Sequence, residues 1–432
     1  MKVAILGFSS LDQSESWPVY RHFKQKGAEI TAYYWGEPDL PADITPKKIE
    51  VGSRLDGLDQ YDLIVRGPAV HPRQINTTAP VTSLTNLFVE QCPSQNIIGV
   101  TGTKGKGTTS TLIAKILQAN HKVWLGGNIG RPLLDDLPDI QPDDWVVLEM
   151  SAGQLIDFSQ NIPTAVCLMV VPEHLDWHTD TKEYLQAKAN LFKHQTADDT
   201  AIYFAGSENS RKIVQASPGH KIPYYQKPGA YVRQDGIIVI GEAEIMPMND
   251  VKLLGEHNLQ NICAALTAVW QVSPNLEAAR QVLSSFSGLE HRLELVRELD
   301  GVKYYDDSFG TTPETAIVAL QAFTGPKVVI LGGSDKGIPF DGLAEAVVKN
   351  NVRHAVLIGH TAPKIKELLA ARGFNNFSEG LKDMKAIVAE ARRVAQRGDV
   401  VLLSTGCASF GLFRDYKDRG NQFKSAVNSL RS

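Results

Sequence analysis

The chain has 432 residues and a formal net charge of -4, and 43% of its residues are hydrophobic and 21% charged. This length exceeds what one hydrophobic core usually supports, so it predicts about three domains, and the composition is typical of a soluble globular protein. The slightly negative charge excludes a global positive field that would attract nucleic acid or an anionic membrane. Any anionic substrate must therefore be held locally, by loops and helix starts.

The first elements predict a small α/β unit. Strands are expected at residues 3–6, 30–34 and 62–65, with a helix at 17–26. The apolar run at the N-terminus is too short for a signal peptide and no segment approaches the length of a membrane span, so we expect a cytoplasmic protein. The first turn, residues 7–11, lacks the glycine fingerprint of dinucleotide binders, and no acidic residue ends the second strand, which argues against a nicotinamide cofactor.

A glycine-rich loop follows the next expected strand, residues 96–100, and precedes a helix-like run. In Gly102-Thr103-Lys104-Gly105-Lys106-Gly107-Thr108, glycines would let the backbone approach an anion, and Lys106 could lie along the β- and γ-phosphates of ATP. The Walker pattern is imperfect, because Val100 and Gly107 replace its first glycine and its hydroxyl residue, which leaves Thr108 as the candidate magnesium hydroxyl. The alternative is an ordinary turn between a strand and a helix.

Strands and helices then alternate, which predicts a mainly parallel sheet. Strands are expected at 122–125, 145–148, 164–171 and 201–204, helices at 182–193, 258–270 and 276–286, and an antiparallel appendage around 231–240. A third α/β unit has strands at 302–305, 327–331, 354–358 and 400–403. The four cysteines, Cys92, Cys167, Cys263 and Cys407, have no metal-type or redox-type spacing and are expected to be buried thiols.

Two strand ends carry candidate metal ligands. Glu149 closes an apolar strand, which puts a hard carboxylate oxygen at the sheet edge where ligands of parallel sheets bind, and such an oxygen suits magnesium. His174 follows a second buried-type strand and could meet the same metal cluster. The alternatives are a surface carboxylate that caps a strand and a satisfied polar histidine, and for His178 the latter interpretation is kept.

The order and spacing of these motifs resemble those of the Mur ligases over the whole chain. The matching segments are Gly102–Lys106, Glu149, Glu173–Asp176, Tyr184–Lys188, Gly255–Asn261, His291–Arg292, Asp307–Ser308 and Gly332–Gly333. The closing segment, Ser404–Phe423, is most similar to the family members that add D-glutamate to UDP-N-acetylmuramoyl-L-alanine. The resemblance implies a monomeric ligase of cell-wall (peptidoglycan) precursor synthesis that works through an acyl phosphate. It implies a Rossmann-like UDP-substrate domain (1–93), a P-loop NTPase-like ATPase domain (94–291) and a Rossmann-like amino-acid domain (292–432).

The resemblance also assigns roles to residues. Lys106, His174 and Lys188 would be catalytic, and Thr108, Glu149, His174 and a carbamylated Lys188 would hold two magnesium ions. A solvated surface lysine is the alternative for Lys188. Besides the glycine-rich loop, ATP would be bound by Asn258, Asn261, Arg292 and Asp307. Asn128, Ser151 and Gln154 would lie near the UDP-sugar and the cleft, and Thr311, Lys336, Ser409, Phe410 and Tyr416 would serve D-glutamate. The alternatives for Arg292 and Thr311 are an inter-domain ion pair and a helix cap before Pro313.

Several residues depart from the family pattern. Gly107 replaces the usual hydroxyl residue after the loop lysine, which makes the loop similar to that of folylpolyglutamate synthase. Phe309 stands in place of a lysine, and Ala152-Gly153 replaces a serine and an aromatic residue. In the first unit, Tyr33-Tyr34 and Gly67-Pro68-Ala69 replace residues expected for uracil and UDP recognition. The alternatives are therefore a related Mur-type or folylpolyglutamate-synthase-like ligase and, in another class, a nucleotide-dependent switch.

Overall fold

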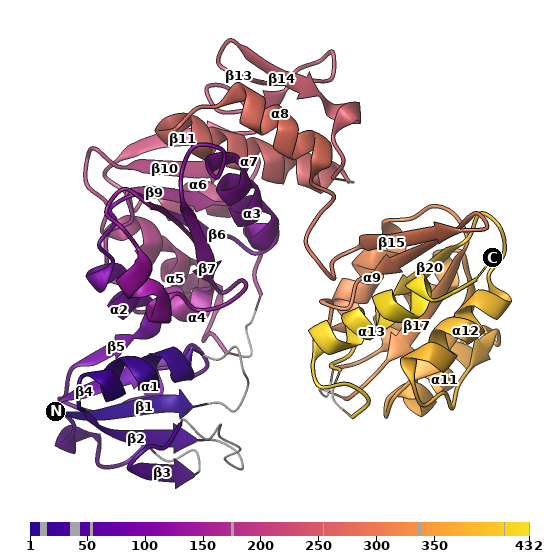
Figure 1. Cartoon of the computed structure of the whole chain (residues 1–432), viewed down its shortest axis with the longest axis horizontal. Coiled ribbons are helices and arrows are strands. Elements are labelled where there is room, and N and C mark those ends of the chain that lie inside the picture. Colours follow the sequence, from indigo (N-terminus) through magenta and orange to yellow (C-terminus); the bar gives the residue numbers. More distant parts are fainter. Residues whose placement is uncertain are drawn as a thin grey trace. The chain divides into compact units, whose positions relative to one another are not determined.

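The chain folds into two compact units, residues Met1–Phe286 and Ser287–Ser432, which are described separately (Figure 1). The computed structural model describes residues 1–8, 15–34, 44–51, 55–173, 177–253, 255–335, 338–409 and 411–431. His174, Lys336 and Phe410 therefore lie outside the described residues. The division after Phe286 lies near the predicted start of the third domain, and the boundary at 93/94 stays a prediction.

The first sheet of unit 1 is parallel, in the order β3 (Lys48–Val51), β2 (Glu29–Tyr34), β1 (Lys2–Phe8), β4 (Leu63–Arg66), β5 (Val81–Ser83). Alternate residues of β1 enter different cores, because side chains of a strand point to opposite faces. Val3 and Ile5 pack with α1 (Ser16–Gln25), and Ala4 and Leu6 with the loop side chains around η1 (Leu58–Gln60). The expected small α/β unit is confirmed.

The second sheet of unit 1 is also parallel. Its order is β11 (His220–Tyr224), β10 (Thr200–Phe204), β9 (Thr164–Cys167), β6 (Ile97–Thr101), β8 (Trp145–Glu149), β7 (Val123–Gly127). Its helices are α3 (Lys106–Leu117), α4 (Ala152–Leu155), α5 (Thr181–Lys193), α6 (Glu208–Val214), α7 (Glu256–Val272) and α8 (Leu276–Ser285). The antiparallel appendage is confirmed as β12 (Tyr231–Val232), β13 (Ile237–Ile240) and β14 (Ala243–Pro247), followed by η4 (Met248–Asp250).

The strand expected at 164–171 is shorter in the structure, because β9 ends at Cys167. The apolar residues that follow bind the glycine-rich loop instead of continuing the sheet. The Thr103 N–H donates to the Met169 carbonyl at 2.9 Å, and the Val171 N–H donates to Thr103 Oγ1 at 3.0 Å.

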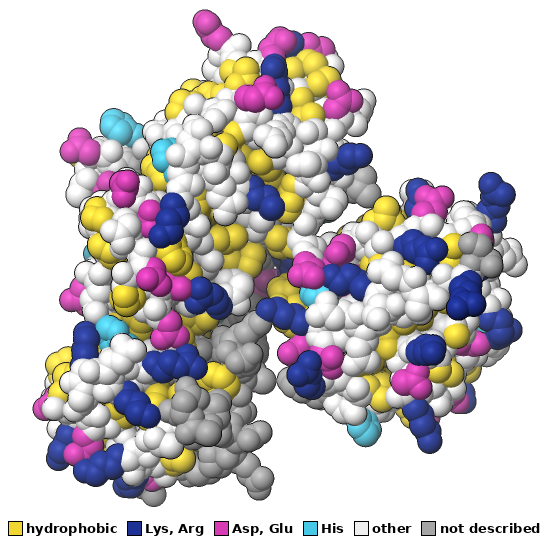
Figure 2. Space-filling model, in the orientation of Figure 1, with side chains coloured by type: hydrophobic (Ala, Val, Ile, Leu, Met, Phe, Trp, Pro, Cys, Tyr) yellow, Lys and Arg dark blue, Asp and Glu magenta, His cyan; other side chains and the backbone are white. Residues whose placement is uncertain are grey.

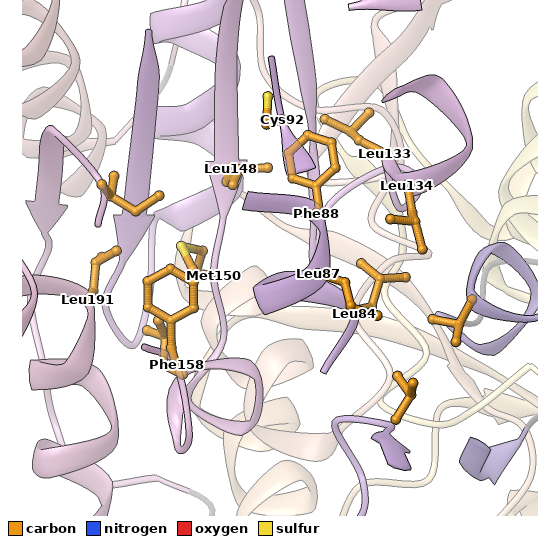
Figure 3. Close-up of a cluster of buried hydrophobic side chains, with 14 of the residues drawn as sticks. Leu84, Leu87, Phe88, Cys92, Leu133, Leu134, Leu148, Met150, Phe158 and Leu191 are labelled. Atoms are coloured by element: carbon orange, nitrogen blue, oxygen red, sulfur yellow. The ribbon is translucent and has the colours of Figure 1, made fainter. Parts of the chain in front are cut away.

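One hydrophobic core connects the two sheets of unit 1. Figure 3 shows Leu84, Leu87 and Phe88 of α2 (Leu84–Gln91) beside Leu133 and Leu134 at η3 (Leu134–Asp139) and Leu148 of β8. Beside this core, the buried Arg66 at the end of β4 donates to both carboxylate oxygens of Asp157, at 2.8 and 2.5 Å. Such a paired fork of hydrogen bonds is stronger than a single bond and fixes orientation, so the two sheets are firmly joined.

Unit 2 contains a sheet of six strands. Its order is β15 (Glu294–Leu299), β16 (Val302–Asp306), β20 (Val400–Leu403), β17 (Lys327–Gly332), β18 (Val352–Ile358), β19 (Phe377–Ser378), and only β15 runs antiparallel. Val329 and Leu331 face a core with α9 (Pro313–Gln321), α10 (Asp341–Lys349) and α11 (Ala362–Ala370). Val328 and Ile330 face another core with α12 (Met384–Val394) and α13 (Tyr416–Asn428).

The distribution of charged side chains on the surface and the state of the cysteines are as the sequence predicts. On the face that Figure 2 draws, Lys and Arg side chains are interspersed with Asp and Glu on each unit. All four cysteines are buried and free. In the described part of the chain, no helix is both long enough and apolar enough to cross a membrane.

Candidate active site

The glycine-rich loop connects β6 to α3 in a backbone that only glycine accommodates at two points. Gly102 has φ +148°, and a Cβ there would lie 2.7 Å from Leu168 Cβ. Gly105 is the N-cap of α3 with φ +86°, and a Cβ on it would clash with Asn261 Oδ1 of α7. The amides of the first turn of α3 lack helical partners and form an anion site. The predicted phosphate loop therefore lies against α7, and the predicted ligand Asn261 approaches it at Gly105.

Lys106 begins α3 and folds back over this loop. Its Nζ donates to the carbonyls of Thr103 at 3.0 Å and Gly102 at 3.3 Å. Lys104, in the same loop, forms an ion pair with Glu173. A phosphate at the helix start would offer Lys106 a stronger, charged acceptor than these neutral carbonyls.

Lys188 is buried under the same loop. It lies on α5, is 1% exposed, and its Nζ donates to the Gly102 carbonyl at 2.9 Å. The Tyr184 ring, one turn earlier, lies 4.6 Å from the same Nζ. Burial, helped by the nearby Lys106 cation, lowers the pKa of Lys188 to about 7. A far larger share of this lysine than of an exposed lysine is then a neutral amine near pH 7, and only a neutral amine can react with carbon dioxide.

Glu149 and Asn128 meet at the carboxyl ends of adjacent strands. Asn128 Nδ2 donates to Glu149 Oε1 at 2.9 Å, and the Asn128 N–H donates to the Glu149 carbonyl at 2.8 Å. Glu149 pairs with Val100 of β6, the strand that leads into the glycine-rich loop. The structure thus brings a predicted metal ligand beside a residue predicted for the UDP-sugar.

The described donors in this region fit magnesium. Glu149 and Thr108 both offer hard oxygen atoms, which magnesium prefers, and β8 contacts α3, the helix that carries Thr108. Thr108 is 6% exposed, whereas Thr109 is fully buried, so Thr108 is the more accessible hydroxyl of the two. A carbamate on Lys188 would add two further oxygen atoms.

Ser151 and Gln154 form a capping box at the start of α4. Ser151 Oγ accepts from the Gln154 N–H at 3.3 Å, and Gln154 Oε1 accepts from the Ser151 N–H at 2.9 Å. Gln154 Nε2 also donates to Glu15 Oε1 at 2.6 Å. These two predicted substrate residues thus cap the start of α4, and Gln154 connects it to Glu15, the residue before α1.

The two asparagines expected at the adenine contact each other on α7. Asn261 Nδ2 donates to Asn258 Oδ1 at 2.8 Å, as their spacing of three residues on one helical face predicts.

Unit 2 gathers its predicted ligands where β16 and β20 end. Asp307 is 6% exposed and accepts from Ser404 Oγ at 2.7 Å and from the Leu293 N–H at 3.2 Å. Burial raises its pKa to about 7 despite these donors. Ser409 is also buried, and Thr311 is partly exposed just before Thr312, the N-cap of α9. The helix cap is therefore Thr312.

Arg292 lies over one of two aromatic rings that contact each other. Its guanidinium lies 4.7 Å from the centre of the Phe309 ring, and the Phe309 ring meets the Tyr416 ring edge-on at 5.1 Å. A cation over an aromatic face is attracted by the ring quadrupole. Phe309, where the family pattern has a lysine, thus supports the neighbouring arginine.

Two family models match this chain. The Mur ligase middle domain matches residues 100–269, and the Mur ligase glutamate ligase domain matches residues 291–407. The UDP-N-acetylmuramoylalanine–D-glutamate ligase of Clostridium novyi is 35% identical over 95% of the chain and 93% of the relative. The chain belongs to the Mur ligase family.

Further relatives and solved structures agree. The ligase of the same name from Symbiobacterium thermophilum is 39% identical over 87% of this Mur ligase and 86% of the relative. MurF from Acinetobacter baumannii has the same fold, with a TM-score of 0.62, 14% identity, and coverage of 99% of this chain and 93% of that chain. MurF ligase from Thermotoga maritima, solved in complex with ADP, has a TM-score of 0.59, 18% identity and 98% coverage of both chains.

Sequence reasoning missed three residues that support the site of this Mur ligase. The Tyr184 hydroxyl lies 2.9 Å from Thr103 Oγ1, and the fully buried Arg419 donates to Ser308 Oγ and to the Ser308 and Cys407 carbonyls at 2.7–3.1 Å. Arg66 joins the two sheets of unit 1. The spacing of Tyr184, one helical turn before Lys188, was a signal, and Arg419 lies in the closing segment that carries the family resemblance, whereas Arg66 showed no signal.

Proposed function

We propose that this Mur ligase joins D-glutamate to UDP-N-acetylmuramoyl-L-alanine at the expense of ATP. The placement of Lys188 carries the proposal, because a buried lysine with a pKa of about 7 under a phosphate loop suits a carbamate beside ATP. The D-glutamate ligases named above, similar over most of the chain, support the choice of substrates. The proposal includes two magnesium ions, a monomer and a cytoplasmic location.

The chemistry proceeds in two balanced steps. The L-alanine carboxylate attacks the γ-phosphorus of ATP, and ADP leaves, which produces an acyl phosphate. The amine of D-glutamate then attacks the acyl carbon, phosphate leaves, and the nitrogen loses a proton. Phosphoryl transfer depends mainly on positioning and on neutralising charge, so cations must stand between the two anionic reactants.

The described residues divide these tasks. Lys106 and the first-turn amides of α3 hold the phosphates, and Asn258 and Asn261 hold the nucleotide beside the loop. Magnesium, held by Thr108, Glu149 and the carbamate, together with the predicted ligand His174, would neutralise phosphate charge. In unit 2, Asp307 accepts from ribose hydroxyls and Arg292 donates to phosphate. Thr311, Ser409 and Tyr416, with the predicted Lys336 and Phe410, receive D-glutamate.

The test is phosphate release by the full chain with ATP, magnesium, UDP-N-acetylmuramoyl-L-alanine and a panel of D- and L-amino acids. We expect release that requires D-glutamate, with equal amounts of the amide product by mass spectrometry. If another amino acid supports release instead, the substrate assignment is wrong. If none does, while a folate acceptor with glutamate does, the chain is a ligase of the folylpolyglutamate-synthase type.

A further inference from the structure

Residues 177–183 form the approach to α5 and its first turn, and the loop that follows β4 in unit 1 contacts this segment. Trp177 Nε1 donates to the Ala69 carbonyl at 3.1 Å. Arg73, in η2 (Pro72–Gln74), donates from Nη1 to Thr179 Oγ1 at 2.6 Å and from Nη2 to the Trp177 carbonyl at 3.2 Å. One arginine fork therefore holds two points of the segment.

His71 holds the first turn of α5. Its Nδ1 accepts from the Arg73 N–H at 3.2 Å, so the ring proton is on Nε2, which lies 3.3 Å from Glu183 Oε2. The same carboxylate oxygen accepts from the Thr179 N–H at 2.6 Å and lies 3.6 Å from His178 Nδ1. The hydrogen bond from the Thr179 amide, together with the nearby His71 ring, lowers the pKa of Glu183 to about 2, so Glu183 is ionised at neutral pH.

His71, His178 and Glu183 are spaced like a metal site, but the protons oppose that interpretation. Their ligand atoms lie within 4.8 Å of one another. A metal on His71 Nε2 would require a proton on Nδ1, which would then face the Arg73 N–H that now donates to it. The cluster is therefore better described as a polar clamp between the loop 67–74 and the start of α5.

The clamp is connected to the phosphate loop through α5. Directly after Glu183, the Tyr184 hydroxyl binds Thr103 Oγ1, and one turn later Lys188 binds the Gly102 carbonyl. Thr103 Oγ1 also donates to the Val171 carbonyl at 2.8 Å. His174, the predicted metal ligand, lies in the sequence between the anchored Val171 and Trp177.

We propose that Arg73 and His71 are positioning residues of the ligase site: through Thr179 and Glu183 they fix the start of α5 and thereby the place of Lys188. The inference rests on the proposed function, in which the first sheet belongs to the domain that binds the UDP-substrate. The loop 67–74 of that domain would then also position α5 and Lys188, which act on the carboxylate of the same substrate.

The test compares Arg73→Ala and His71→Leu with Arg21→Ala. Arg21 is a matched control because its Nη1, 3.0 Å from Asp135 Oδ2, also joins the first sheet's helix α1 to the second part of unit 1, far in sequence from α5. We expect each test variant to lower kcat and to raise the magnesium concentration for half-maximal activity, on the order of fivefold. KM for the UDP-substrate should change less than kcat, and Arg21→Ala should stay within about twofold of wild type.

Hydrogen exchange gives a readout without substrates. Peptides that cover residues 177–193 should exchange faster in Arg73→Ala and His71→Leu than in wild type and Arg21→Ala, and Arg73→Lys, which retains one of two donors, should be intermediate. Unchanged exchange there, or a rise in KM for the UDP-substrate with kcat unchanged, would overturn the proposal. Should a variant fail to fold, Thr179→Val removes one of the two acceptors of Arg73, the Thr179 hydroxyl, and leaves the Trp177 carbonyl in place.

The two proposals can fail separately. A wild-type protein without D-glutamate-dependent phosphate release refutes the proposed function, whereas the exchange comparison still decides whether the clamp fixes α5.

Discussion

Each unit buries, near the carboxyl ends of its parallel strands, an ionisable side chain whose pKa is moved to about 7 by burial, and these two groups have opposite charge. In unit 1 burial lowers the pKa of Lys188 to about 7, and in unit 2 burial raises the pKa of Asp307 to about 7. Removal from water disfavours the charged form of either group, so both are driven toward neutrality at the same pH. The partners differ, because Lys188 has one carbonyl acceptor while Asp307 has a hydroxyl and an amide donor.

The difference shows how one physical cause prepares two kinds of chemistry. A neutral lysine can react with carbon dioxide to give an anionic carbamate, so a side chain that is usually a cation becomes an anion that attracts magnesium. A neutral carboxyl group can regain its charge when ribose hydroxyls donate to it. In the proposed reaction, each of these two side chains would therefore take its working charge only when its reactant is present.

The largest expected effect is the loss of activity when Lys188, the buried lysine of unit 1, is replaced. Lys188→Ala should lower kcat on the order of 10²–10³-fold, because it removes the carbamate proposed beside the phosphates, and short carboxylic acids should restore part of the activity. Lys193→Ala, on the exposed end of the same helix, is the control and should leave kcat unchanged. Full activity of Lys188→Ala, with no effect of added acids, would contradict the assignment. Steady-state kinetics with and without acetate measure both.

The magnesium hydroxyl gives the next effect. Thr108→Ala should raise the magnesium concentration for half-maximal activity about tenfold to a hundredfold, whereas Thr109→Ala, which removes the fully buried neighbouring hydroxyl, should change it far less. Magnesium titrations of phosphate release measure this. Equal effects at both positions would mean that the hydroxyl is wrongly placed.

Asp307→Asn tests the aspartate side. It should raise KM for ATP about tenfold by weakening the ribose acceptor. It should also stabilise the protein, and more at pH 8 than at pH 5. The folded Asp307 keeps its proton up to about pH 7, whereas the unfolded one loses it near 3.8, so its cost to stability grows as pH rises through that window. Thermal unfolding at both pH values checks the sign, and a larger gain at pH 5 would contradict it.

Lys188→Met should show the opposite pH trend in buffers free of carbon dioxide. The folded Lys188 loses its proton near pH 7 and the unfolded one only near 10.5, so the cost of burying it is complete below pH 7 and falls as pH rises. The substitution should therefore raise the unfolding temperature more at pH 7 than at pH 9.5. Parallel trends for Lys188→Met and Asp307→Asn would end the comparison between the two units.

The smallest effect concerns the ring under Arg292. Phe309→Leu should raise KM for ATP about twofold to fivefold, because an exposed cation–π contact contributes about 0.5–1 kcal/mol. Phe309→Tyr, which keeps the ring, is the control. An unchanged KM for ATP in Phe309→Leu would show that the ring does not support Arg292 in nucleotide binding.

Much of the fold followed from local pattern. The alternation of strands and helices, the antiparallel appendage and the loop between β6 and α3 are confirmed, because apolar runs and glycines act over a few residues. The strands β3, β5, β11, β15 and β19 were not predicted, since they lack the uninterrupted apolar run that marks β4 and β20. The end of β9 at Cys167 depended on Thr103, a residue far away in the chain.

The sequence by itself determined which chemical groups this Mur ligase has and in what order they follow the strands. The glycine-rich loop, Glu149 and Lys188 could be named from spacing and resemblance. Only the tertiary structure decided their state. The lowered pKa of Lys188, the raised pKa of Asp307, the fork of Arg66 on Asp157 and the clamp of Arg73 on Thr179 all depend on desolvation and on contacts between distant segments. No local pattern records these effects, because the dielectric environment of a side chain exists only once the chain has folded around it.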